Sequence, residues 1–266
     1  MKAITRYSFL FFIAMILVSS CQKIEADAVQ SRPVVEGYLE AGHPISVKVT
    51  SEALFSEADT SRAIDGLNLQ LTVDGQTYPL TYDNYGVYRE NSLLVESGRS
   101  YAVQFNYKDK VINSSATIPG QPVNFQESDS ILVIHRFNSS TGKGFPLLPS
   151  PIVLRWENTD LSYYLVVVKN IETNPERINL GVSEPVIIFR TNPIQTNTYP
   201  VRARLFQYYG RHRIILYKIN AEYAALYQDN GSSSLNIKTP FTNVINGLGI
   251  FTGINSDTVM LRIKKN

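Results

Sequence analysis

The segment LNLQLTVDGQTY, residues 67–78, indicates the fold class. Its apolar residues occupy every second position: Leu67, Leu69, Leu71 and Val73. In an extended chain this spacing puts all four side chains on one face of a strand. Asp74-Gly75 follows, and both residue types tolerate the positive φ of a two-residue turn. The segment therefore predicts a β-hairpin with one apolar face.

The same alternation recurs along the chain. It is found at Ile45–Val49, at Tyr101–Tyr107 and at Val259–Ile263, where a last short strand is expected. Hydrophobic residues make up 44% of the 266 residues and charged residues 18%, which excludes a disordered chain. The 16 tyrosines and 12 phenylalanines favour strands over helices. We therefore expect an all-β protein built as β-sandwiches.

The segment IPGQPVN, residues 118–124, contains two prolines and a glycine and predicts a domain boundary. It divides the chain into an N-terminal β-sandwich, 33–118, and a C-terminal β-sandwich, 123–266. Residues 152–171 resemble the tryptophan-bearing strand and its neighbour in fibronectin-type domains, with Trp156 in the core. The expected fold is two consecutive immunoglobulin/fibronectin-like sandwiches.

The second sandwich is expected to contain one short helix and one basic hairpin. The segment NAEYAALYQDNG, residues 220–231, combines a capping Asn220, helix-favouring alanines and a terminating Gly231. Val201–Tyr209 and Arg211–Lys218 flank Gly210, which predicts two strands joined by a turn.

The N-terminus has the features of an export signal. Lys2 and Arg6 precede Phe9–Val18, an apolar run that is too short to span a membrane. VSSC, residues 18–21, ends at the only cysteine of the chain and resembles a bacterial lipobox. The resemblance implies a signal peptide at 1–20, a lipidated Cys21 and a tether at 21–32 that holds the protein on a membrane. The alternative is an ordinary secretory signal with a chance cysteine.

Charge is unevenly distributed along the chain. Residues 185–266 contain ten basic and three acidic residues, and no acid lies between Pro185 and Ala221. Four arginines interleaved with aromatic residues are the candidate partner-binding residues: Arg202, Arg204, Arg211 and Arg213. Anionic head groups, an acidic glycan or an acidic protein face would suit them, and a solvated strand face is the alternative. Nucleic acid is not expected as a partner of a lipid-anchored exported protein.

The sequence offers no catalytic or metal-binding pattern. His43, His135 and His212 lack metal-ligand spacing and are expected at the surface. No Gly-x-Ser-x-Gly elbow is present, and a lipidated Cys21 leaves no thiol. We expect no enzyme, no cofactor and no metal.

The glycines of NGLGIFTG, residues 246–253, do not form a nucleotide-binding loop. Their spacing departs from Gly-x-Gly-x-x-Gly, and too few residues follow for the required helix and strand. Gly247, Gly249 and Gly253 are instead expected in a structural turn before the last strand, with Ile250 and Phe251 in the core.

Three segments resemble a family of Bacteroidota lipoproteins, the domain of unknown function numbered 4249. They are PVVEGYLEAGHPISVKVT (33–50), GVYRENSLLVESGRSYAVQF (86–105) and TPFTNVINGLGIFTG (239–253). The family implies two β-sandwiches on the cell envelope, encoded near TonB-dependent outer-membrane transporters, and brings no catalytic residues. The expected function is a non-enzymatic accessory or ligand-capturing subunit of such a β-barrel transporter. A stand-alone structural or adhesive surface lipoprotein is the alternative.

Two further expectations concern location and modification. CQKIEAD, residues 21–27, partly resembles the export signal of surface-exposed lipoproteins, although a generic tether would look similar. The expected location is the outer membrane. Ser130 in DSI and Thr258 in DTV resemble the acceptor triplet for O-glycosylation in exported Bacteroidota proteins.

Overall fold

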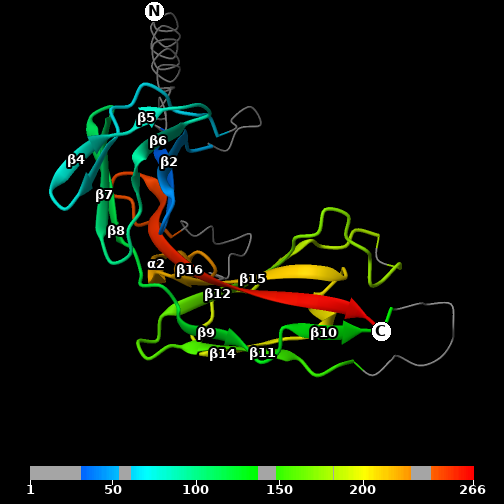
Figure 1. Ribbon diagram of the computed structural model, residues 1–266. Coiled ribbons are helices and arrows are strands. Elements are labelled where there is room, and N and C mark those ends of the chain that lie inside the picture. The colour runs from blue at the N-terminus through cyan, green and yellow to red at the C-terminus, as the bar shows by residue number, and fades with distance from the viewer. Residues whose placement is uncertain (1–30, 54–60, 137–147, 182, 229–240) are drawn as a thin grey trace, which may run out of the picture. The chain divides into compact units, whose positions relative to one another are not determined.

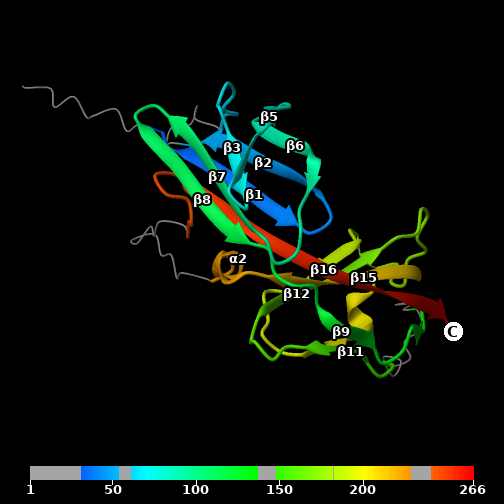
Figure 2. The same ribbon diagram turned by 60° about the vertical axis from the view of Figure 1, so that its left-hand side comes forward.

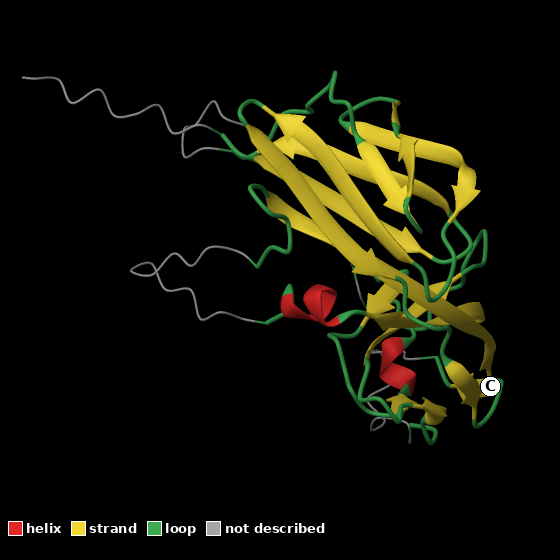
Figure 3. Ribbon diagram, turned by 90° about the vertical axis from the view of Figure 1, so that its left-hand side faces the viewer, coloured by secondary structure: helices red, strands yellow, loops and turns green. Residues whose placement is uncertain are grey.

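The computed structural model describes residues 31–53, 61–136, 148–181, 183–228 and 241–266. In Figure 1 the described residues form mainly strands, with little helix. The first half of the chain has eight strands, namely β1 (Pro33–Glu40), β2 (Pro44–Ser51), β3 (Gln70–Val73), β4 (Gln76–Pro79), β5 (Thr81–Tyr82), β6 (Val87–Leu94), β7 (Ser100–Tyr107) and β8 (Lys110–Thr117). The second half has β9 (Val123–Glu127), β10 (Ile131–Ile134), β11 (Ile152–Glu157), β12 (Tyr163–Asn170), β13 (Ile188–Arg190), β14 (Thr198–Val201), the 3₁₀ helix η2 (Ala203–Leu205), β15 (Gly210–Ile219), the helix α2 (Ala221–Ala225) and β16 (Leu248–Lys265). The expected all-β architecture with one short α-helix is confirmed for the described residues (Figure 3).

The predicted hairpin is confirmed as β3 and β4. Val73 pairs with Gln76, and the turn residues Asp74 and Gly75 have φ values of 50° and 80°. The alternating apolar residues of β3 point into a buried core shared by β1, β2, β6, β7 and β8. Strands β4-β3-β7-β8 form one layer of this first core, and β1, β2, β6 and β5 belong to the large sheet that forms the other (Figure 2).

A second core lies between the rest of the large sheet and the sheet β14-β11-β9. The large sheet runs β13-β12-β15-β16-β1-β2-β6-β5, and β10 also pairs with β16. Trp156 is buried in this core as expected, with its ring centroid 5.4 Å from that of Tyr164. The chain passes from the sheet β14-β11-β9, to which β9 belongs, to the large sheet, where β10 pairs with β16.

Strand β16 serves both cores and is much longer than the predicted final strand. Its first residues, Leu248–Ile254, pair in parallel with Val34–Glu40 of β1. The following residues, Ile254–Ile263, pair antiparallel with β15. Val244 and Phe251 are buried in the first core, so residues assigned by sequence to 123–266 complete the sandwich assigned to 33–118. The boundary at 118–124 stays a prediction, and Arg32–Asn266 form one compact unit.

The glycine-rich segment is structural, but its geometry differs from the expected turn. Gly249 and Gly253 lie inside β16, and only Gly247 adjoins a turn, at Asn246. Gly249 has a φ of 97°, and a Cβ there would lie 2.0 Å from the Val35 oxygen. The close parallel approach of β1 therefore requires glycine. Ile250 and Phe251 are buried, as expected.

The asparagines of this segment hold the backbone in place. Asn243 Nδ2 donates to the Phe251 carbonyl at 2.8 Å, and the Phe251 N–H donates to Asn243 Oδ1 at 3.0 Å. Asn246 Nδ2 donates to the Val111 carbonyl at 2.9 Å. These bonds tie the segment to its own strand and to β8, which gives the polar side chains a structural role.

The predicted hairpin around Gly210 is wrong. Strand β14 pairs with β11, and the chain then turns through η2 before β15 begins. Strand β15 pairs with β12 and β16 instead of with residues 201–209.

The predicted helix is present as α2, but its expected cap differs. The Asn220 side chain donates to the Thr117 carbonyl at 2.9 Å and not to the backbone of α2, while Gly231 lies outside the described residues. No helix in the described part of the chain is both long and apolar enough to cross a membrane.

Candidate functional site

The most distinctive surface is one face of the large sheet, on the strands β12, β13, β15 and β16. On β15, Ile214 and Leu216 are fully buried in the second core, whereas Arg211 and Arg213 are exposed on the opposite side. The cross-strand pairs place exposed residues of β13 and β16 on the same side, whereas on β12 only Lys169 is exposed there, because Leu165 and Val167 are buried. We call this side the open face; its basic residues, all exposed, are Lys169, Arg190, Arg211, Arg213, Arg262 and Lys264.

Basic residues stand directly opposite one another on the open face. Lys169 of β12 pairs with Arg213 of β15, and Arg211 of β15 pairs with Arg262 of β16. Directly opposed side chains in an antiparallel pair have Cβ atoms about 5 Å apart, so like charges there destabilise the sheet. The open face therefore carries a positive potential that its own strands do not relieve.

One carboxylate partly neutralises this charge. Glu172 Oε1 accepts from the Arg211 backbone N–H at 2.8 Å and from Arg211 Nε at 3.1 Å. These two bonds, the backbone one first, lower the pKa of Glu172. Within the described residues, no carboxylate lies within salt-bridge distance of Lys169 or Arg213.

The structure separates the four arginines proposed from the sequence. Arg211 and Arg213 lie on the open face, but Arg202 and Arg204 flank and occupy η2, beyond the β14 strand that pairs with β11. The reason is the 3₁₀ turn, which interrupts the strand alternation on which the hairpin prediction depended. Sequence reasoning also missed four basic residues of the open face, on β12, β13 and β16. The alternation of Arg262 and Lys264 with buried Leu261 and Ile263 was the available signal.

Aromatic residues border the open face near α2. The ring centroid of Tyr223 lies 5.4 Å from that of Tyr38 and 5.9 Å from that of Tyr227. The Tyr227 hydroxyl beside Arg190 raises the pKa of that guanidinium. Arginine beside tyrosine is a combination favoured at protein-binding sites.

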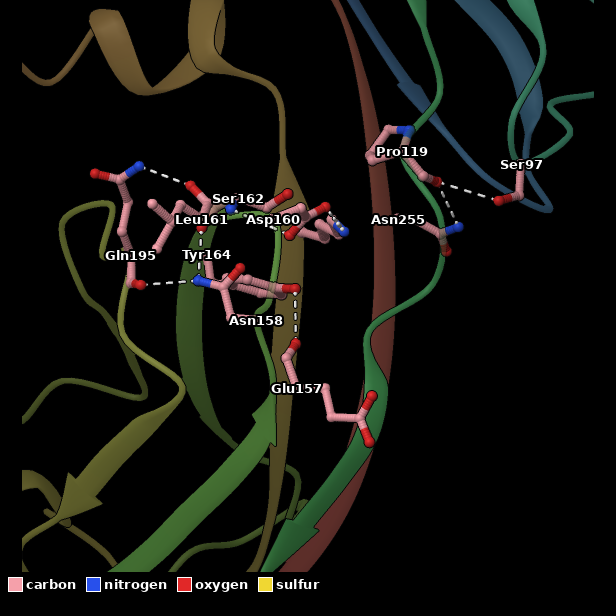
Figure 4. Close-up of polar contacts among 11 residues, drawn as sticks. Ser97, Pro119, Glu157, Asn158, Asp160, Leu161, Ser162, Tyr164, Gln195 and Asn255 are labelled. Atoms are coloured by element: carbon pink, nitrogen blue, oxygen red, sulfur yellow. Dashed lines mark hydrogen bonds and ion pairs between the residues drawn. The ribbon is translucent and has the colours of Figure 1, made fainter.

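Lys218, on the covered side of β15, is held in an internal contact. Its Nζ donates to Asp160 Oδ2 at 2.8 Å and lies 6.0 Å from the Tyr164 ring centroid. The Lys218 ammonium, followed by the Ser162 hydroxyl, lowers the pKa of Asp160 to about 2. Figure 4 shows the turn between β11 and β12, where Asn158 Nδ2 also donates to the carbonyls of Ser162 and Gln195. The contact fixes the turn between β11 and β12.

Figure 4 also shows how the segment after β8 is attached to β16. Ser97 Oγ and Asn255 Nδ2 both donate to the Pro119 carbonyl, at 3.2 and 2.9 Å. Asn255 is buried, so this bond satisfies a polar group that would otherwise be unpaired inside the protein.

His212 is buried, contrary to the surface position expected from its arginine neighbours. Its side chain lies on the covered side of β15, with Nδ1 3.2 Å from the Gly210 carbonyl and Nε2 3.2 Å from Asn170 Nδ2. Burial lowers the pKa of His212, which favours the neutral ring at pH 7. His43 and His135 are exposed. In the parts of the chain that the structure covers, no three metal-ligating side chains gather.

The remaining candidate residues are modification sites. Ser130 is exposed in the bend before β10, and Thr258 is exposed on β16. Cys21 and the segments around it, 1–20 and most of 21–32, lie outside the described residues. O-glycosylation and lipidation remain predictions.

Comparison with known proteins gives a family and a distant structural likeness. The chain is similar in structure to domains A168–A170 from titin, with 10% sequence identity and a TM-score of 0.23; the match covers 88% of this chain and 67% of that one. No curated protein matches the sequence. The family model described as "Domain of unknown function (DUF4249)" matches residues 22–259. Because this match covers most of the sequence, the chain belongs to the DUF4249 family.

Proposed function

We propose that the chain is a lipoprotein of the bacterial cell envelope, anchored to the outer membrane through Cys21. In this proposal it acts without catalysis, as an accessory or ligand-capturing subunit of a TonB-dependent β-barrel transporter. The open face is the docking surface, and it binds an acidic face of the transporter.

The like-charged pairs across β12, β15 and β16 carry the proposal. Lys169 opposite Arg213 weakens the free sheet, and Arg211 opposite Arg262 does so to a smaller extent, because Glu172 partly neutralises Arg211. Carboxylates of an acidic partner would attract these cations and offset the repulsion between them. Complementary charge also orients the two proteins before contact. A lipid anchor confines both to one membrane, where effective concentration is high and a weak contact suffices.

A pull-down from native membranes in mild detergent tests the proposal. The test variant carries Lys169→Gln, Arg213→Gln and Arg262→Gln on the open face. The control variant carries Arg155→Gln, Arg202→Gln and Arg204→Gln, three exposed residues on β11 and around η2. Both variants lose three positive charges, so a difference in recovery between them cannot be caused by net charge alone.

The wild type and the control should recover the same β-barrel, and the test variant should recover at least about tenfold less, as expected for losing a few kcal/mol of charge pairing. Raising the salt concentration should weaken wild-type recovery. Circular dichroism would establish that both variants are folded. Equal recovery by the two variants would exclude the open face as the docking surface. A wild type that purifies without a β-barrel would favour the stand-alone structural or adhesive alternative.

A further inference from the structure

The strand β13 forms one end of the large sheet. Its three residues, Ile188–Arg190, pair with Val167–Lys169 of β12, and β13 is the terminal strand in the sheet order. Among the residues that the structure describes, no strand pairs with its other edge. Edge strands offer their free N–H and C=O groups to any extended chain that can align with them.

The hydrogen bonds of β13 fix which groups point outward. The Asn170 N–H donates to the Ile187 carbonyl at 3.0 Å, and the Thr191 N–H donates to the Val166 carbonyl at 3.0 Å. Odd-numbered residues of this segment therefore bond to β12. In an antiparallel pair the intervening residues direct their backbone groups away from the partner. The N–H and C=O groups of Ile188 and Arg190 thus point to the free edge.

The side chains along this edge are unusually apolar for an exposed strand. Val186, Ile187 and Ile188 are 63%, 50% and 47% exposed. Proteins normally protect a sheet edge with charges, proline or a bulge. Contiguous exposed apolar residues often mark an interaction site. A partner strand would bury these residues while satisfying the backbone groups.

We propose that the free edge of β13 binds an extended segment of the partner protein by strand addition. Because alternate residues share one face, the segment would place an apolar side chain opposite Ile188 and a carboxylate opposite Arg190, two residues apart. Lys169 of β12 pairs with Ile188, and Arg213 of β15 pairs with Lys169, so positive charge lies beside the site. An acidic, apolar strand matches this charge pattern.

A second copy of this chain matches the edge poorly. Antiparallel pairing of two β13 strands, centred on any of their three residues, sets Arg190 opposite Val186, Ile188 or another Arg190. None of these supplies a counter-charge. The inference rests on the proposed function, since it describes how a segment of the transporter would bind beside the open face.

The test uses two proline variants at matched edges. Ile188→Pro removes an outward N–H from β13 without removing a bond to β12. Val133→Pro does the same on β10. The Arg262 N–H donates to the Ser130 carbonyl, so the backbone groups of even-numbered β10 residues point to β16 and the Val133 N–H points away from it. Purified protein is titrated with a seven-residue peptide of alternating valine and aspartate, and amide shifts are followed by NMR.

The peptide should shift the amides of Ile188 and Arg190 in the wild type and in Val133→Pro. Ile188→Pro should bind it about fivefold or more weakly, as expected for one lost hydrogen bond. A peptide with lysine in place of aspartate should bind more weakly to all three proteins. Equal binding of the aspartate peptide by the two proline variants, or shifts confined to β10, would overturn the proposal.

Two outcomes separate this inference from the proposed function. If Ile188→Pro recovers the β-barrel as well as the wild type, while the open-face variant fails to, docking stands and strand addition is wrong. If the purified wild type dimerises in light scattering and Ile188→Pro does not, a second copy occupies the edge and the acidic strand does not. If no β-barrel is recovered by any protein, the peptide titration still decides the inference.

Discussion

The two ends of β16 have very different surroundings, although they belong to one continuous strand (Figure 2). Residues Ile250–Asn255 are buried in succession, between β1 and the segment after β8. From Thr258 onward exposed and buried residues alternate, and the exposed ones include Arg262 and Lys264. The first end holds the protein together, and the second end contributes to its candidate docking surface.

The difference follows from what each end contacts. At the first end, Gly37 of β1 pairs with Phe251, and a Cβ on Gly37 would lie 2.4 Å from the Phe251 ring. Phe251 is buried in the first core, and Ile254 is buried in a separate cluster with Ala224 of α2, so both faces of the strand are covered. At the second end only one face meets a core, through Leu261 and Ile263, so the other face tolerates charge. A glycine-rich motif that resembles a functional loop is structural here, and an ordinary alternating segment carries the candidate site.

Replacing Gly249 should give the largest effect and tests the structural role of the first end. Gly249→Ala forces a side chain into the left-handed region and against the Val35 oxygen, which should lower the free energy of unfolding by about 4 kcal/mol. Urea denaturation would measure it. Gly75→Ala is the control, because Gly75 also has a positive φ but has no atom within 4 Å of the added Cβ. It should lose only about 1–2 kcal/mol; equal losses would mean that close approach to β1 is unimportant.

His212, which is buried beside the second end of β16, should make the stability of the protein depend on pH. His212, which pairs with Leu261 of β16, has its pKa lowered by burial, while Glu172 acts in the opposite direction. Below a pH of about 6.5 the unfolded chain binds a proton that the folded protein resists, so the unfolded state gains stability as pH falls.

Urea denaturation between pH 7 and pH 5 should therefore show stability falling with pH, by up to about 1.4 kcal/mol per unit from this residue. His212→Gln should be less stable at pH 7 and should lack this part of the slope. His43→Gln, at an exposed position, should retain it. A slope unchanged in His212→Gln would show that another group causes it.

Sequence reasoning predicted the fold through local alternation and turn chemistry, which is why β2, β3, β7 and the Asp74-Gly75 turn agree with the structure. It missed contacts between distant segments. Parallel pairing of β1 with β16 joins residues more than two hundred positions apart, and no local pattern announces it. Only two of the six basic residues of the open face were predicted, for the same reason: Arg211 and Arg213 share a strand, whereas Lys169 and Arg262 join them only through the pairing of distant strands.

The smallest expected effect concerns the exposed side of the second end, and its sign makes it informative. Arg213 stands opposite Lys169, so removing its charge should relieve repulsion and raise the free energy of unfolding by about 0.2–1 kcal/mol. Arg204→Gln, on η2, should change stability little. Added salt should shrink the gain of Arg213→Gln, because screening already weakens the repulsion in the wild type. Lys169→Gln should give a similar gain, and the double variant should gain less than the sum, since either change alone removes the pair. If Arg213→Gln instead lost stability, and the loss did not depend on salt, the arginine would stabilise its own sheet through packing. The argument that the open face carries repelling charges suited to an acidic partner would then fail.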